Sequence, residues 1–222
     1  MDKSFDPTER VSVNKHSSIR IAGSKVLYFD PFEYPVESHD ADIIFITHDH
    51  YDHFSSDDIR KVANENTLLV VPEAMKKSVL DKTSISRKNI VYMNPRQRKE
   101  FSRLMVEAVP AYNKLKPFHG KGKEWLGYVV TLDDVKYYIA GDTDVTKEAL
   151  AVRCDVAIVP IGGFYTMDAK DAAKLVREIH PKYAIPVHYG KIVGKPEDAD
   201  TFATSLPRDI RPVIKITLPE EQ

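Results

Sequence analysis

Short apolar runs, separated by polar turns, recur along most of the chain. Continuous apolar runs bounded by polar residues, glycine or proline are typical of buried strands. They predict strands over residues 19–21, 26–30, 43–46, 67–71, 90–93, 101–109, 125–132, 135–140, 156–160, 183–187 and 213–216. Two of the junctions, Ala22 to Lys25 and Asp133-Asp134, have the length and composition of tight hairpin turns.

Helical spacing of apolar residues is confined to a few segments. It predicts helices capped near Ser55, started by Pro72 and running to Leu80, and covering residues 168–179 and 199–205. Strands outnumber helices and occur both as hairpins and in alternation with helices. This pattern favours an α/β fold (α+β in some schemes) of mixed sheets covered by helices. With no linker, composition break or repeat, residues 1–222 are expected to form one domain.

The overall charge is balanced. The 222 residues include 32 basic and 33 acidic ones, for a net charge of -1, so no global field recruits nucleic acid or an acidic membrane. One stretch, residues 96–123, is locally basic. It is read either as a solvated face or as a rim that attracts anions.

Cysteine usage and hydropathy bear on the setting. The single Cys154 excludes an internal disulfide and a cysteine-based zinc cluster, and its apolar surroundings predict a buried thiol. The start of the chain is polar, and no apolar run has the length needed to cross a bilayer. A cytoplasmic setting, with no membrane partner, is the default expectation.

Candidate chemistry is concentrated in residues 48–53, His-Asp-His-Tyr-Asp-His, directly after a predicted buried strand. Imidazole nitrogens and carboxylate oxygens are donors that zinc prefers. A structural metal site is the alternative, but structural zinc sites are closed and favour cysteine. This cysteine-free set on a loop therefore favours a catalytic or substrate-facing site.

The spacing of these donors predicts two neighbouring metal ions. In extended backbone His48 and His50 point the same way, whereas the adjacent Asp52 and His53 point differently. Two-metal hydrolases hold their ions roughly 3.5–4 Å apart and need further ligands. Asp142 and His188 each follow a predicted strand, so both are candidates. His16 is expected to be a surface or hydrogen-bonded histidine, and His180 a helix cap.

These motifs resemble those of a known superfamily. Thr47-His48-x-His50-x-Asp52-His53, then Gly141-Asp142-Thr143, then Val187-His188 is similar to the metallo-β-lactamase-fold hydrolases. The segments at 109–113, 160–163 and 186–190 resemble its small single-domain members related to ascorbate-phosphate lactonases. The resemblance implies a four-layer αββα sandwich of two mixed sheets with metals at one edge.

The resemblance also implies roles for individual residues. His48 and His50 would bind the first metal; Asp52, His53 and His188 would bind the second; and Asp142 would bridge the two. Asp52 would orient the metal-activated water and handle its proton. The superfamily usually supplies a third histidine to the first metal near Ala111, but this chain has Tyr112-Asn113 there. Asn113 and His119 are candidate substitutes, and all three of Tyr112, Asn113 and His119 are candidate substrate-binding residues.

Three functions follow from these expectations. The first is a metal-dependent hydrolase of a small anionic ester, lactone or phosphoester, with one or two ions per chain, zinc being favoured and manganese the alternative. The second is a phosphodiesterase of RNA or a nucleotide, against which the balanced charge argues. The third, prompted by the absent histidine, is a binding or regulatory protein without turnover. Small members of this kind often associate, which leaves a homo-oligomer open.

Overall fold

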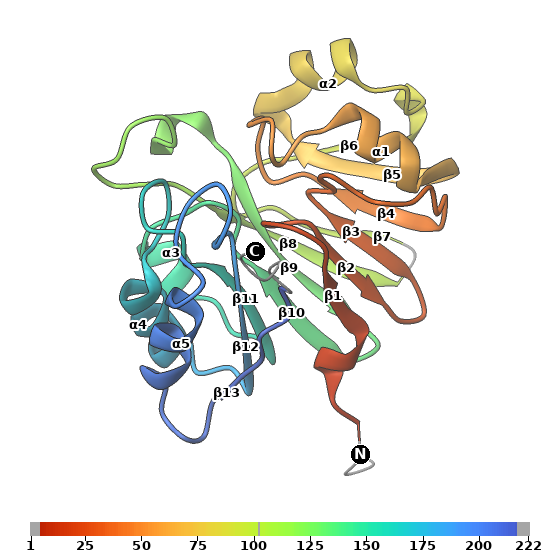
Figure 1. Ribbon diagram of the computed structural model, residues 1–222. Coiled ribbons are helices and arrows are strands. Elements are labelled where there is room, and N and C mark those ends of the chain that lie inside the picture. The colour runs from red at the N-terminus through yellow and green to blue at the C-terminus, as the bar shows by residue number, and fades with distance from the viewer. Residues whose placement is uncertain (1–4, 102, 217–222) are drawn as a thin grey trace.

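Two β-sheets pack face to face, with helices on both outer faces, in the computed structural model of the protein (Figure 1). The structure describes residues 5–101 and 103–216. The arrangement is the four-layer αββα sandwich, and this prediction is confirmed.

The first sheet has six strands in sequence order. They are β1 (Val11–Val13), β2 (Ile19–Ala22), β3 (Val26–Phe29), β4 (Ala41–Phe45), β5 (Ala63–Pro72) and β6 (Ile90–Met93). β1, β2 and β3 pair antiparallel, and β3 to β6 pair parallel. The predicted hairpin between β2 and β3 is confirmed, whereas the short strand β1 was not predicted.

The second sheet has seven strands, ordered β13-β12-β11-β10-β9-β8-β7. They are β7 (Arg98–Phe101), β8 (Leu104–Pro110), β9 (Leu126–Leu132), β10 (Val135–Ile139), β11 (Val156–Pro160), β12 (Tyr183–Val187) and β13 (Arg211–Pro212). β7 to β10 pair antiparallel and β10 to β13 parallel, so this sheet is also mixed.

Helices cover the two outer faces. They are α1 (Ser56–Val62) and α2 (Lys76–Lys82) on the first sheet, and α3 (Lys147–Leu150), α4 (Ala169–Ile179) and α5 (Asp198–Thr204) on the second (Figure 1). Short 3₁₀ turns cover Pro7–Arg10, Glu73–Met75, Arg87–Asn89 and Lys121–Lys123. The side chains of Ser55 and Asp168 cap α1 and α4, and His180 ends α4 in the left-handed region. The predicted cap at His180 is therefore confirmed.

Alternation along the strands creates the core between the sheets. Phe45 of β4 lies 5.1 Å, between ring centroids, from Tyr128 of β9, whose hydroxyl donates to the carbonyl of Ile46 at 2.8 Å. The first sheet is therefore joined to the second sheet both by side-chain packing and by a hydrogen bond. These contacts hold the end of β4, where the histidine-rich loop begins, against the second sheet.

Some predicted boundaries are wrong. The expected strand over 101–109 is a hairpin of β7 and β8, because Arg103 adopts φ +72° and reverses the chain. The final strand is Arg211–Pro212 and not 213–216. Pro72 ends β5, and a 3₁₀ turn separates it from α2. The turn at Asp133-Asp134 is confirmed, with both residues at positive φ. Among the described residues, no helix has the length and apolar character needed to cross a membrane.

Candidate metal centre

Strand ends and turns bring eight candidate metal donors to one edge of the sandwich. The loop after β4 carries His48 to His53, Asp142 follows β10, and His188 follows β12. His16 lies in the turn between β1 and β2, and His119 lies between β8 and β9. The donors form two groups, in each of which the candidate donor atoms lie within 4.8 Å of one another. The first group is His48, His50, His119 and Asp142; the second group is His16, Asp52, His53 and His188.

The first group contains the histidine that the motifs lack. His48 Nε2 lies 3.0 Å from His50 Nδ1 and 3.8 Å from Asp142 Oδ2. The His119 ring centroid is 4.6 Å from that of His48. Donors about 2.0–2.2 Å from a tetrahedral ion lie about 3.3–3.6 Å from one another. The spacing of this group fits a single divalent ion among its donors.

The second group surrounds one carboxylate oxygen. Asp52 Oδ2 lies 3.5 Å from His53 Nε2 and 3.7 Å from His188 Nε2. The nearest imidazole is that of His16, whose Nε2 lies 3.1 Å from the same oxygen. His16 is 4% exposed, so the expectation of a surface or hydrogen-bonded histidine is wrong.

Asp142 lies between the two groups. Its Oδ2 faces His48 Nε2 at 3.8 Å, while its Oδ1 lies 3.4 Å from His53 Nε2 and 3.3 Å from His188 Nε2. One carboxylate thus presents a different oxygen to each group. This is the placement that a bridging ligand requires.

Most donors in this buried region have no hydrogen-bond partner in the described structure. The unpartnered atoms are both ring nitrogens of His16, His119 and His188, Nε2 of His53 and Oδ1 of Asp142. Buried polar groups normally have hydrogen-bond partners, and each one left without costs about 1–3 kcal/mol. A set of orphaned nitrogens and oxygens that converge on two points is explained by metal ions, so the residues present fit a metal pair.

The protonation states also suit metal binding. Burial lowers the pKa of His119 to about 3 against the opposing charge of Asp142. Burial and the neighbouring imidazoles lower the pKa of His48 well below its usual value. Burial lowers the pKa of His16 to about 4, against the opposing effect of Asp52. Burial opposes ionisation of Asp142, but the His188 and His53 charges outweigh it and lower the pKa of that carboxyl. Neutral imidazole and ionised carboxylate are the forms that ligate metals.

His53 is held differently from the other histidines. Burial favours its neutral form, but Asp142 and Asp30 outweigh burial and raise its pKa to about 10. Its Nδ1 lies 2.7 Å from Asp30 Oδ2, which leaves Nε2 to face the second group. Binding of a cation at Nε2 therefore has to displace a proton.

Asp30 was not predicted as part of the site. It is 1% exposed and accepts hydrogen bonds from the backbone N and Oγ1 of Thr47 at 2.8 and 2.6 Å. Thr47 Oγ1 in turn lies 2.8 Å from His48 Nδ1. Asp30 and Thr47 thus orient one histidine of each group from behind, as outer partners of metal ligands do. Asp30 has φ +45°, a conformation that strand patterning does not reveal.

A closed loop delivers His119. The backbone N of Asn113 donates to the His119 carbonyl at 2.7 Å, so residues 114–118 project while His119 turns back and is 2% exposed. The Asn113 side-chain nitrogen donates to the Tyr165 carbonyl, and its Oδ1 has no partner. Trp125 packs against His119, His48 and His50 with centroid distances of 4.4, 5.0 and 4.9 Å. His119 thus lies among the donors, while Asn113 closes its loop.

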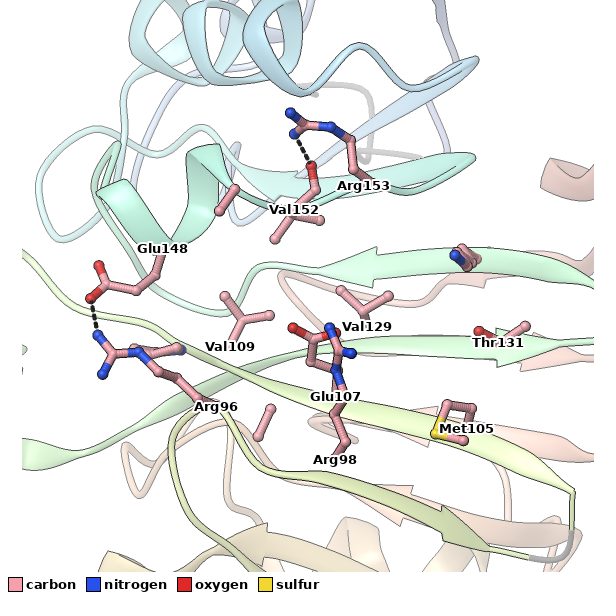
Figure 2. A pocket seen from close by; sticks show the side chains of 14 residues that line it. Arg96, Arg98, Met105, Glu107, Val109, Val129, Thr131, Glu148, Val152 and Arg153 are labelled. Carbon is pink, nitrogen blue, oxygen red and sulfur yellow. Dashed lines mark hydrogen bonds and ion pairs between the residues drawn. The ribbon is translucent and has the colours of Figure 1, made fainter.

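The Tyr112 side chain belongs to a hydrogen-bonded network with Glu148 and Arg96. Its hydroxyl donates to Glu148 Oε2 at 2.8 Å, and Arg96 donates to the other oxygen of Glu148 at 2.9 Å. Arg96 and Glu148 line a hollow of about 680 Å³ beside β8, β9 and α3, together with a second ion pair (Figure 2). There Arg98 pairs with Glu107 at 2.8 Å. None of the lining residues belongs to either group of donors, so the hollow is separate from the candidate centre.

Comparisons with known proteins agree with this geometry. The family described as the beta-lactamase superfamily domain matches residues 10–188, which include every donor of both groups. The chain belongs to the metallo-β-lactamase superfamily. Membership confirms the predicted family and, at the level of the family, the predicted enzyme class of metal-dependent hydrolase. The narrower likeness to ascorbate-phosphate lactonases stays a prediction.

Relatives in the superfamily cover most of the chain. A UPF0173 metal-dependent hydrolase of Thermococcus onnurineus is 32% identical over 200 residues, which are 82% of this chain and 87% of the relative. A crystal structure of a candidate metal-dependent hydrolase from Parabacteroides distasonis has 29% identity and a TM-score of 0.73, and the match covers 93% of each chain. A metallo hydrolase of Ignicoccus hospitalis, at 18% identity and TM-score 0.73 over 92% of this chain and 93% of its own, shows the fold alone.

Proposed function

We propose that this superfamily member hydrolyses a small anionic ester, lactone or phosphoester with two divalent metal ions, zinc being favoured. His48, His50 and His119 would hold one ion, Asp52, His53 and His188 the other, and Asp142 would bridge them. The observation that carries the proposal is the convergence of buried, unpartnered donor atoms on two points that share Asp142.

Bound metal ions would supply Lewis acidity that lowers the pKa of water towards 7 and stabilises a developing oxyanion. The chain's own residues position the reactants. The Asp52 side chain is 11% exposed, compared with 4% for Asp142, so it is the carboxylate nearer solvent. We assign to Asp52 the orientation of the attacking water and the acceptance of its proton at a carboxylate oxygen.

The access side of the centre supports an anionic substrate. His50 is half-buried and its neighbours Asp49 and Tyr51 are exposed, so solvent reaches the donors there. The Lys123 ammonium lies 5.2 Å from the centroid of Trp125, the residue that packs against the first group. Among the described residues, Lys123 has no ion pair, whereas Lys116 and Lys121 are paired with Asp144 and Glu148. Lys123 is therefore a cation beside Trp125 that is available to an incoming anion.

The observations favour turnover over a binding role. The binding alternative rested on the absent third histidine, and we assign that role to His119, whose donor atom lies within 4.8 Å of those of His48, His50 and Asp142. In the basic stretch at 96–123, which prompted the nucleic-acid alternative, four of the eight basic side chains are paired with Glu107, Asp144 or Glu148. No observation favours RNA as a substrate.

Steady-state assays test this function. Purified protein loaded with zinc or manganese is assayed against chromogenic lactones, carboxylic esters, phosphomonoesters and phosphodiesters, before and after chelation. We expect metal-dependent hydrolysis of at least one class. Protein that holds both ions yet turns over none of these substrates would contradict the hydrolase proposal.

A pair of lysine variants tests the preference for anions. Lys123→Ala should raise KM for an anionic substrate roughly fivefold, since an exposed charge contributes about 1 kcal/mol. Lys136→Ala, an exposed lysine beside the separate hollow, is the matched control and should leave KM unchanged. Equal KM values in all three proteins would remove Lys123 from substrate binding.

A further inference from the structure

His16 occupies a strained turn that places its imidazole inside the metal centre. It has φ +54°, in the left-handed region, where residues other than glycine are uncommon and are held by their surroundings. The turn is closed by Asn14 N donating to the Ser18 carbonyl at 2.9 Å and Ser18 N donating to the Lys15 carbonyl at 2.7 Å. The turn between β1 and β2, the first hairpin of the chain, thus carries a buried histidine that the hydrophobic pattern of the two strands does not explain.

The His16 side chain has neighbours but no hydrogen-bond partner. Its Nε2 lies 3.1 Å from Asp52 Oδ2, yet the geometry is not that of a hydrogen bond, and both ring nitrogens are unpartnered. The ring centroid lies 3.6 Å from that of His188, with the planes tilted by 38°. A purely stacking role would leave both buried ring nitrogens unpaired, which is costly.

The backbone couples His16 to a strand end of the second sheet. The His188 backbone N donates to the His16 carbonyl at 2.9 Å, and His188 itself has φ +60°. This bond joins the first hairpin to the residue after β12. The two imidazoles are therefore positioned together, each beside Asp52 Oδ2.

We propose that His16 is an additional ligand of the second metal ion, an inference that rests on the binuclear centre of the proposed function. His16 would then be a further protein donor to the ion held by Asp52, His53 and His188. With Asp142, its donors number five, from His16, Asp52, His53, His188 and Asp142. The first ion has four, from His48, His50, His119 and Asp142.

This difference assigns unequal roles to the two ions. An ion with more protein donors is held more tightly, and an ion with fewer protein donors more readily accepts an additional ligand from the substrate. The second ion would therefore be retained during chelation, while the first would exchange. Because His16 lies in the turn between β1 and β2, that turn would contribute to the retention of the second ion.

Two variants test the ligand role. His16→Phe keeps an aromatic ring against His188, and His16→Asn suits the left-handed backbone; both lack the imidazole donor. Metal affinity is measured by chelator competition, and ligand number by the absorption spectrum of the cobalt(II) form. We expect about 10- to 100-fold weaker binding of the tighter ion, a range typical of disturbed metal shells, and an altered cobalt spectrum. His39→Phe, an exposed histidine, is the matched control.

A crystal structure of the zinc-loaded, unaltered protein gives an answer that does not depend on variant folding. A ring nitrogen of His16 is expected about 2.0–2.2 Å from the zinc that lies among Asp52, His53 and His188. A zinc there with no His16 nitrogen within bonding distance, or wild-type affinity and cobalt spectrum in both variants, would overturn the inference and leave the proposed hydrolase intact. A wild-type chain that binds no metal would overturn both.

Discussion

The two donor groups share Asp142 but are supported by different kinds of structure. In the second group, Asp30 holds His53 from behind and a backbone hydrogen bond ties His188 to the first hairpin. In the first group, His119 comes from a loop whose Leu115 and Phe118 are 97% and 67% exposed. Segments with exposed backbone and few buried contacts open more easily than packed strand ends.

The glycines show the same contrast. A Cβ on Gly162, beside the second group, would lie 2.4 Å from the His188 carbonyl oxygen. A Cβ on Gly120, next to His119, would have no neighbour within 4 Å. The second position is thus preformed by close packing, and the first is completed by a loop with room to move. We expect the two ions to differ in affinity for this reason.

The largest effect is expected where the groups meet. Asp142→Ala removes an oxygen from each ion, so it should abolish stoichiometric metal binding at both positions. It should also lower kcat/KM by about 10³-fold, since the metals contribute several kcal/mol to transition-state stabilisation. Metal content by mass spectrometry and kinetics measure this. Asp49→Ala, an exposed aspartate of the same loop, should keep both ions; retention of both ions in Asp142→Ala would disprove the bridge.

Removing the loop histidine should separate the groups. His119→Ala takes a donor from the first ion only, so metal content should fall from two ions to one, and activity should fall because the proposed hydrolysis uses both ions. Equilibrium dialysis followed by elemental analysis reports the stoichiometry. His180→Asn changes an exposed histidine at a left-handed cap that asparagine tolerates, and should behave as wild type. Loss of both ions from His119→Ala would show that the positions are not independent.

The support of the second group is tested at Asp30. Asp30→Asn removes the charge that orients His53 while keeping the side-chain size. Outer partners of metal ligands contribute about 10- to 100-fold to affinity, so the second ion should bind weaker by that factor. Chelator competition on protein containing one equivalent of zinc measures the change. An unchanged affinity would mean that Asp30 serves only the packing around Thr47.

The smallest effect concerns stability. Gly162→Ala forces the His188 carbonyl and Val193 to move and should lower the free energy of unfolding by about 1–3 kcal/mol. Gly120→Ala should change it by no more than about 0.5 kcal/mol. Urea denaturation of the metal-free proteins gives both values. Equal values for the two variants would argue against the difference in packing between the groups.

The comparison also explains which parts of the centre were predictable. Four of the predicted ligands lie within six consecutive residues after a strongly apolar strand, so their pattern alone indicates a metal site. They are His48, His50, Asp52 and His53. Asp142 and His188 follow predicted strands, and strand ends meet at one edge of the sandwich. The six residues could be predicted to lie together because hydrophobic patterning determines where strands stop, and the structure places them in the two donor groups.

The remaining contributors depend on turns. His16 lies in a turn after β1, which has only three residues. A strand this short does not show a pattern from which its ends can be predicted. Asp30 and His16 both have positive φ, and His119 depends on closure of a loop by Asn113. Their placement comes from backbone hydrogen bonds between distant segments. Weaker signals in the sequence pointed to two of these residues: His16 lies just before a predicted hairpin strand, and His119 is followed by Gly120.

Metal-specific anomalous scattering from crystals of the zinc-loaded protein tests whether two ions share Asp142. We expect two peaks about 3.5–4 Å apart, one among His48, His50 and His119 and one among Asp52, His53 and His188, with Asp142 between them. A single peak, or two peaks that do not share Asp142, would contradict the proposed bridge.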